Sequence, residues 1–307
     1  MSTPTPTELQ RQTLPAGFLS EKAVGYAAIV ITVAIWAGFA LSIRAIHASP
    51  LAPADVALLR FGLPAVLLLP FLPSRLRALR RVRPVDALMV IAGAGLPFFY
   101  IAAAGGAATS ATHVGALIAG TTPLSVALLG WAVEGRPVPA SRWRALAIIL
   151  AGVAALVLTQ STHAGASMGK GAALLLTASL FWGAYTLGLR RTGLDAIGCT
   201  LLLCVPSLAA LILLILSGAV TTNIGQFTLT QAFPFILVQG LGVGVVASLA
   251  YAVAISRLGP ARSAVIGSLA PALASLLAVP LLGESLTPMI VAGVATITLG
   301  VVLANRS

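Results

Sequence analysis

Long apolar segments follow one another along nearly the whole chain, separated by short stretches that hold most of the charged residues. Each segment has about 20 residues, the length that a helix needs to cross a hydrocarbon layer about 30 Å thick. Apolar and polar residues do not alternate within them, as residues 173–181 (ALLLTASLF) illustrate, which argues against a transmembrane β-barrel. The pattern predicts an all-α membrane protein with ten transmembrane helices, at residues 24–46, 51–72, 85–106, 111–133, 141–160, 168–190, 196–217, 234–256, 261–282 and 287–304.

The composition supports the same class. Hydrophobic residues make up 59% of the 307 residues, charged residues make up 8%, and the mean hydropathy is +1.04. In a soluble domain about a quarter of the residues are charged. Residues 1–22 are rich in Thr and Pro and have no apolar run up to Ser20, so we expect them to form a disordered cytoplasmic tail.

The net charge of +11 comes from basic residues that gather on one side of the predicted membrane. With the N-terminus in the cytoplasm, all but three of the 18 Lys and Arg residues fall in the tails or in cytoplasmic loops. The exceptions are Arg44 and Lys170, which fall outside, and Arg60, which falls within a span. This positive-inside distribution predicts that both termini are cytoplasmic. It also explains the basic charge without a nucleic-acid partner.

The second half of the chain repeats the first. The segment WAGFALSIR, which begins at Trp36, matches WGAYTLGLR, which begins at Trp182, and Pro123 and Pro271 stand in equivalent surroundings 148 residues apart. The matches predict two units of five helices, residues 23–160 and residues 161–307. Because five is an odd number, the second unit must enter the membrane in the opposite direction. Inverted repeats are typical of secondary transporters, in which the substrate binds near the midplane between the halves.

A proline interrupts matching spans of the two units, in GALIAGTTPL (residues 115–124) and in SAVIGSLAPA (residues 263–272). Proline removes a backbone donor and clashes with the preceding turn, so each helix is weakened there. Interrupted helices at matching positions point to the binding site of a transporter. We expect Pro123 and Pro271 to act as gating hinges. A static kink that only improves packing is the alternative.

Polar and aromatic side chains are rare in the middle of the spans, and a polar group in lipid is costly unless it is paired or faces a cavity. Each of these residues also has a structural explanation that does not involve substrate. The glutamine could form a hydrogen bond between helices, the threonines could bond to carbonyls freed by the proline, and the aromatic rings could pack in the core. Trp182 and Tyr185 share one helical face, and Trp182 is our first choice for contact with substrate. The candidate substrate-binding residues are Trp36, Tyr100, Thr121, Thr122, Trp182, Tyr185, Gln239, Tyr251 and Ser268.

Arg60 is the only charged residue predicted away from the ends of a span, and gating is one role for it. Snorkelling to the interface, or pairing with Asp55 about one turn away, is the alternative. His113 falls at the outer edge of a span, where we expect it to be solvated. No Asp or Glu falls in the middle of a span and the chain has no P-loop motif, which favours substrate movement down its gradient, or exchange, over proton antiport or ATP-driven pumping. We expect no metal and no cofactor.

These features, in this order, resemble the EamA family of the drug/metabolite transporter superfamily over residues 24 to 304. The resemblance is carried by the Trp-Gly elements of the first and sixth spans, Arg60 in the second, the two mid-span prolines, and Gly283 with Glu284 (LLGESL) after the ninth. The first unit departs from the pattern, since Arg136 stands where an acid is expected.

The resemblance implies a multi-pass secondary transporter of small organic metabolites in the bacterial cytoplasmic membrane. The function that it implies first is export of neutral or aromatic amino acids, similar to the YddG type. The alternative is a multidrug carrier of the same fold. The expected partners are the small-molecule substrate and membrane lipid, and a monomer is the working expectation.

An intramembrane serine hydrolase is the competing class, because GASMG (residues 165–169) matches G-x-S-x-G with Ser167 as the nucleophile. The motif falls in a short loop without the strand-to-helix elbow that exposes such a serine. Small residues are common in this chain, so a chance match is expected, and we predict that the protein is not an enzyme.

Overall fold

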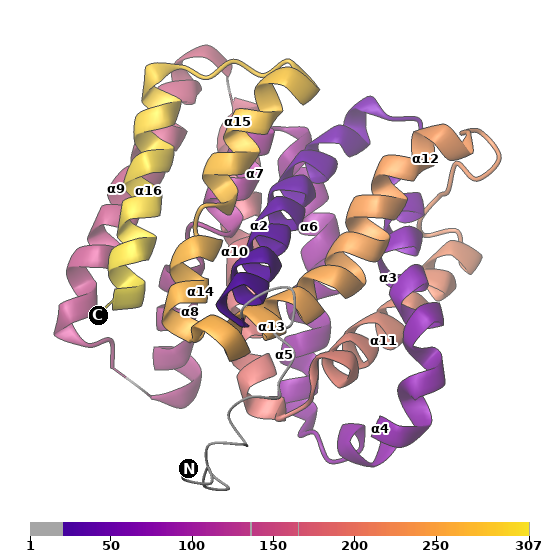
Figure 1. Cartoon of the computed structure of the whole chain (residues 1–307). Helices are drawn as coiled ribbons and strands as arrows, with labels where there is room; N and C mark the ends of the chain where they lie inside the picture. The colour runs from indigo at the N-terminus through magenta and orange to yellow at the C-terminus, as the bar shows by residue number, and fades with distance from the viewer. Residues whose placement is uncertain (1–20, 136, 165, 307) are drawn as a thin grey trace, which may run out of the picture.

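The computed structural model describes residues 21–135, 137–164 and 166–306, and in these residues the chain folds as a bundle of helices (Figure 1). Two short 3-10 turns, η1 (Ile46–Ala48) and η2 (Leu69–Phe71), continue the first two helices, and η3 (Ile236–Val246) is a π-helix. The α-helices are α2 (Glu21–Ala45), α3 (Pro53–Leu68), α4 (Leu72–Leu79), α5 (Pro84–Ala94), α6 (Leu96–Ala107), α7 (Ala111–Ile118), α8 (Thr122–Glu134), α9 (Ala140–Ala164), α10 (Ala166–Thr192), α11 (Ala196–Leu216), α12 (Leu229–Phe235), α13 (Ala247–Leu258), α14 (Pro260–Gly267), α15 (Ala270–Leu282) and α16 (Pro288–Arg306).

The start of α2 and the end of α16 lie at the same end of the bundle, in the lower half of Figure 1. We call this the terminal end, and the other the opposite end. Within the described residues, nine helical segments are long and apolar enough to cross a membrane: Glu21–Ala48, Pro53–Leu79, Pro84–Ala107, Ala111–Glu134, Ser167–Thr192, Ala196–Leu216, Leu229–Leu258, Arg262–Leu282 and Pro288–Asn305.

These nine segments coincide with nine of the ten predicted spans, so the membrane class is confirmed. The largest difference in boundary is in the second span, which continues to Leu79 instead of ending at residue 72. The remaining predicted span, residues 141–160, falls within the 25-residue helix α9, and the count of ten stays a prediction. Residues 21 and 22, which we expected in the tail, begin α2, whereas residues 1–20 lie outside the described part of the chain.

Four spans are interrupted, and they are matching spans of the two predicted units. The fourth breaks between α7 and α8 and the ninth between α14 and α15, so that Pro123 and Pro271 each take the second position of a new helix. A proline is tolerated there because an N–H group in the first turn has no acceptor within its helix. The third span breaks at Gly95 between α5 and α6, and the eighth contains η3. The helices are thus interrupted where the prolines predicted weakness.

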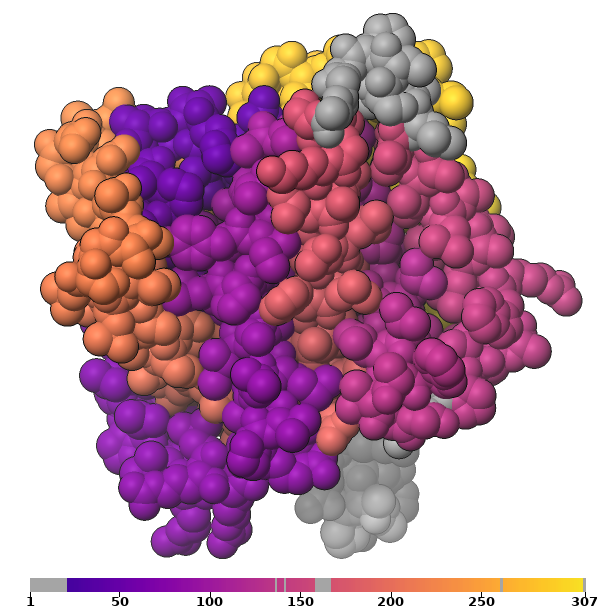
Figure 2. Space-filling model, turned by 180° about the vertical axis from the view of Figure 1, so that it is seen from behind, coloured from indigo at the N-terminus to yellow at the C-terminus, as the bar shows by residue number. Residues whose placement is uncertain are grey.

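Helix packing in one half has a counterpart in the other. The first helix of the second unit, α10, packs against α5, α7 and α8, and α2 packs against α13, α14 and α15. In Figure 2 the surface of α10 lies beside that of α5 and α6. The unbroken α9 and α16 pack on each other. A Cβ atom on Gly152 would lie 2.9 Å from the backbone nitrogen of Ile297, and one on Gly300 would lie 2.9 Å from that of Ile149, so glycine permits this close approach.

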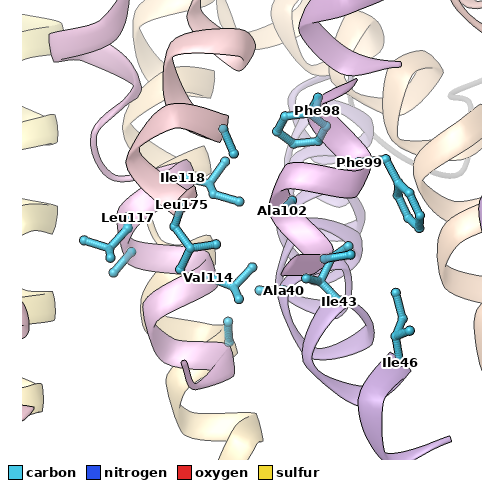
Figure 3. Close-up of a cluster of buried hydrophobic side chains, with 14 of the residues drawn as sticks. Ala40, Ile43, Ile46, Phe98, Phe99, Ala102, Val114, Leu117, Ile118 and Leu175 are labelled. Carbon is cyan, nitrogen blue, oxygen red and sulfur yellow. The ribbon is translucent and has the colours of Figure 1, made fainter. Parts of the chain in front are cut away.

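A core of buried apolar side chains joins α2, α6, α7 and α10 in the half of the bundle nearer the opposite end. Figure 3 shows Ala40 and Val114 pointing toward one another across this core, with Ile118 and Phe98 nearby. These four residues also border the cavity described below. The core therefore forms the floor of that cavity.

Candidate functional site

A cavity of about 1070 Å³ lies inside the bundle, with walls from both predicted units. This is at the upper end of the size range of small-molecule sites. Three of the predicted site residues, Tyr100, Thr121 and Gln239, do not border it. The predicted residues that do are Trp36, Arg60, Thr122, Pro123, Trp182, Tyr185, Tyr251, Ser268 and Pro271.

Aromatic rings form a row along one wall of the cavity. The ring centroids are 5.9 Å apart between Phe39 and Phe98, 5.4 Å between Phe98 and Trp182, and 4.9 Å between Trp182 and Tyr185. The rings come from α2, α6 and α10, and their separations are those of favourable aromatic contacts. The row brings the apolar rings of Phe39, Trp182 and Tyr185 to the cavity around Phe98, which is itself only 1% exposed.

Arg60, on α3, borders the cavity although it is only 4% exposed. Its Nη1 donates a hydrogen bond of 2.8 Å to Oε1 of Gln239, and Nε2 of Gln239 donates one of 2.7 Å to Oγ of Ser42. Gln239 belongs to η3, so this network joins α2, α3 and the π-helix. The guanidinium carbon lies between 5.3 and 6.0 Å from the centroids of four phenylalanine rings, which is within reach of cation–π attraction.

The alternative reading of Arg60, as a snorkelling residue or a partner of Asp55, is wrong. The side chain is buried, and Asp55 is engaged elsewhere at the start of α3. Its Oδ2 accepts hydrogen bonds from the backbone N–H groups of Ala52 (2.8 Å) and Asn223 (3.0 Å). Asp55 therefore caps its own helix and ties it to the loop between α11 and α12.

The candidate hydroxyl groups bond to carbonyls near the helix breaks. Thr121 and Thr122 donate to the carbonyls four residues earlier, at 2.6 and 3.0 Å, and Ser268 donates to the carbonyl three residues earlier, at 2.7 Å. A helix end leaves such carbonyls without a backbone donor. The hydroxyls satisfy them, and this is the structural role that competed with substrate binding. Tyr100 lies outside the cavity, edge-on to Phe99.

The cavity reaches the terminal end of the bundle. Its lining includes Glu134 at the end of α8, Arg190 near the end of α10 and Asn305 near the end of α16. Its innermost residues, Ala40 and Val114, belong to the buried core. Among the described residues, none from the loops of the opposite end lines the cavity, so in this part of the chain the chamber opens toward the terminal end only.

Ion pairs at the terminal end join neighbouring helices beside the cavity mouth. Arg191 Nε lies 2.7 Å from the buried Oδ1 of Asp86, which ties α10 to α5. Arg75 Nη2 lies 2.8 Å from Oδ2 of Asp195, and the hydrogen bonds from this guanidinium lower the pKa of the Asp195 carboxyl. These pairs hold adjacent helices together without crossing the cavity.

The opposite end is closed by contacts between the two units. Oε1 of Glu284, just after α15, accepts a hydrogen bond of 2.7 Å from the backbone N–H of Ala111, the first residue of α7, and lies 3.9 Å from Nε of Arg44 on α2. Nδ2 of Asn223 donates to the carbonyl of Pro50 at 2.8 Å. We call the contact of Glu284 with Ala111 and Arg44 the opposite-end seal.

His113 and Ser167 lie near this seal. His113 is fully buried, with Nδ1 2.6 Å from Oγ of Ser110, so the expectation of a solvated histidine is wrong. The reason is that the first turn of α7 lies beneath the loop that carries Glu284, packed against α2, α10 and α15. Ser167 is in the first turn of α10, and its G-x-S-x-G motif begins at residue 165, outside the described residues.

The geometry is that of a membrane-embedded chamber with access from one side. Residues 169–306 match the EamA-like transporter family. This match covers most of the second predicted unit and supports a membrane transporter of small molecules. The likeness to the YddG type stays a prediction.

A solved crystal structure has the same fold. The similarity covers 92% of this chain and 96% of that chain, with a TM-score of 0.59 and 19% sequence identity. At this sequence identity, the similarity indicates a shared fold and does not indicate a shared substrate or role. No curated protein sequence matches this chain.

Sequence reasoning missed two residues of the aromatic row. Phe39 stands three residues after Trp36, on the same helical face, and could have been found by that spacing. Phe98 follows the break at Gly95, where Pro97 occupies the second position of α6. The rule that an interrupted span marks the site would have found it, had it been applied to the third span.

Proposed function

We propose that this protein is a secondary transporter that carries a small organic molecule across the membrane by alternating access, without ATP. The observation that carries the proposal is the cavity of about 1070 Å³, which has walls from both predicted units and access from the terminal end only. A carrier of this kind exposes a midplane site to one side at a time. The match of residues 169–306 to a transporter family supports the same class.

The substrate that the cavity suits best has a flat apolar part. The row from Phe39 to Tyr185 offers stacking surface, and Trp182 lies in the middle of this row. Neutral or aromatic amino acids, moved outward, are the first candidates. A multidrug carrier is the alternative, and it would be favoured if cationic drugs alone were transported.

The breaks at Pro123 and Pro271 are the proposed hinges. Both prolines border the cavity, and each begins a helix whose axis is free to change relative to the half-helix before it. The matched positions of the breaks, and the matched packing of the two halves, support an inverted repeat in which the hinges work as a pair.

The terminal end is proposed to face the cytoplasm, because it carries most of the arginines of the described chain. In a Cys199→Ala, Cys204→Ala background, Ile224→Cys at the opposite end should react with a membrane-impermeant thiol reagent added to cells from outside. Ala78→Cys in α4 should not. Both sites are exposed, so accessibility through the protein does not limit either reaction. The reverse pattern would overturn the orientation.

Counterflow in liposomes tests the function itself. Purified protein is reconstituted with an internal pool of unlabelled compound, and uptake of the labelled compound is followed for aromatic amino acids, other neutral amino acids, nucleosides and cationic drugs. We expect uptake of aromatic compounds without ATP and without an imposed proton gradient. Absence of counterflow for the whole panel, with protein that remains folded, would refute a carrier of these classes.

A further inference from the structure

Arg60 is a buried cation that no acidic residue of the described chain meets. Its Nη1 bonds to the neutral amide of Gln239, and its Nε is buried without a hydrogen-bond partner among the described residues. A guanidinium carries five N–H donors, so the observed bond leaves most of its capacity unused. The nearest candidate counterion in sequence, Asp55, is occupied by the backbone N–H groups of Ala52, just before α3, and of Asn223, in the loop between α11 and α12.

A charge in this position is costly unless something compensates for it. Four phenylalanine rings and one amide oxygen stabilise a cation only in part, and an arginine keeps its charge under all physiological conditions. The structural network explains how Arg60 is held in place. It does not explain why a cation stands at the wall of a chamber large enough for a ligand.

The surroundings of Arg60 indicate the shape of a ligand that would satisfy its remaining N–H donors. Phe39 and Phe98 lie under the guanidinium and begin the aromatic row that continues to Trp182 and Tyr185. A carboxylate matches the planar fork of an arginine, and a flat apolar body attached to it would lie along the row. The ammonium group of a zwitterion finds no acidic partner near Arg60, because Glu134, the only acid in the lining among the described residues, stands at the mouth.

We propose that Arg60 binds the carboxylate of the transported molecule, and that the substrate is an aromatic organic acid for which an α-amino group is dispensable. This rests on the proposed transport function and names the substrate class of the same cavity. It also narrows the amino-acid proposal, because the carboxylate and the ring are the groups recognised and the ammonium is not.

A ligand series on the unmodified protein tests this directly. Binding to purified protein in detergent is measured by quenching of tryptophan fluorescence, since Trp182 lies in the cavity wall. The probes are 3-phenylpropionate, its neutral amide, phenylalanine and phenethylamine. We expect the acid to bind about 10- to 100-fold more tightly than the amide, as a charge-assisted hydrogen bond is lost. Phenylalanine should bind no more tightly than the acid, and phenethylamine should bind most weakly.

Variants assign the effect to Arg60. Arg60→Gln should remove most of the preference for the acid over the amide, because the acid loses a charge-assisted hydrogen bond and the amide only a weaker one, and Arg60→Lys should retain part of the preference. Arg77→Gln makes the same charge change on an exposed part of the same span, away from the cavity, and should change nothing. If Arg60→Gln does not fold, the ligand series on the unmodified protein still decides.

The outcomes separate this inference from the function beneath it. Equal binding of acid and amide, or a preference for the amine, together with counterflow of the bound compound, would overturn the role of Arg60 and leave the transporter standing. An unchanged preference for the acid in Arg60→Gln would do the same. Absence of binding of all four probes would overturn this inference alone, and absence of counterflow for the whole panel, with folded protein, would refute the transport function as well.

Discussion

Glu284 closes the opposite end of the bundle, so replacing it should let that end open more often. In Glu284→Ala the carboxylate that accepts the 2.7 Å hydrogen bond from Ala111 is lost, together with the 3.9 Å approach to Arg44. The first contact ties α15 to the start of α7, and the second ties it to α2. Both join elements of different predicted units, which must separate if a path is to open at this end.

The size of the effect follows from the two contacts. A hydrogen bond from an N–H group to a charged carboxylate stabilises by about 1.5–3 kcal/mol. The ion pair adds about 0–1 kcal/mol, because the Arg44 side chain is 36% exposed and the atoms are 3.9 Å apart. Oε2 of Glu284 is buried without a partner among the described residues, and its desolvation offsets part of this gain. A net loss of about 2 kcal/mol raises the population open at the opposite end about 30-fold.

Accessibility of a cysteine at Val114 measures this population. Val114 lies at the cavity floor, and a membrane-impermeant thiol reagent added from the opposite side reaches it only when that end opens. The labelling rate should rise about 30-fold in Glu284→Ala. It should rise less in Glu284→Gln, which keeps an oxygen for the bond from Ala111. Ser285→Ala, a change at an exposed neighbour, is the matched control. Equal labelling rates of the cysteine at position 114 in Glu284→Ala, Glu284→Gln and Ser285→Ala would refute the seal. The reagent must label Ile224→Cys in the same experiment, which shows that it reaches the opposite end.

Three further groups of substitutions test the site and the fold. Trp182→Ala should abolish or strongly weaken counterflow in protein that still purifies folded, and Trp182→Phe should retain part of it with altered preference; a lower melting temperature with unchanged transport per folded molecule would make Trp182 a packing residue. Pro123→Ala and Pro271→Ala should each slow transport with membrane insertion unchanged, and normal rates in both and in the double variant would leave only static kinks. Gly93→Ala should destabilise by about 1–3 kcal/mol, because its Cβ would lie 2.5 and 2.6 Å from backbone atoms of α10, whereas Gly130→Ala, with open space around it, should not; thermal unfolding in detergent decides.

The sequence predicted the spans well, because a run of about 20 apolar residues has few interpretations. It also located the breaks at Pro123 and Pro271, where a local rule applies. The surroundings of Arg60 could not be predicted in the same way. Its partner Gln239 is 179 residues away in the chain, and that pairing depends on the π-helix η3 meeting α3. Local reasoning offered Asp55 instead, which already accepts hydrogen bonds from the backbone N–H groups of Ala52 and Asn223.

In the candidate site, too, some residues could be predicted from local sequence and others depend on how the helices pack. The tryptophans at equivalent places, Trp36 and Trp182, were found by the repeat and both border the cavity. The threonines before Pro123 were found by their polarity, and both donate to carbonyls of the preceding turn, yet Thr122 borders the cavity whereas Oγ1 of Thr121 lies 2.7 Å from Oγ of Ser179 on α10. Polarity inside a span therefore predicts a special position, and only the packing of the helices decides which of these residues lines the chamber.

The helix breaks also separate the parts of the bundle that are closed from those that are open. The halves α7 and α15 meet at the opposite-end seal through Ala111 and Glu284, whereas α8 and α14 run to the terminal end and line the open chamber. The unbroken α9 and α16 are held together at Gly152 and Gly300, too closely for any larger side chain. Since a continuous, tightly packed helix pair resists bending and a broken helix does not, we expect α9 and α16 to move as one body while the half-helices on either side of each proline change their angle. Closing the mouth would then bring α8 and α14 together at the terminal end, as α7 and α15 are together at the other.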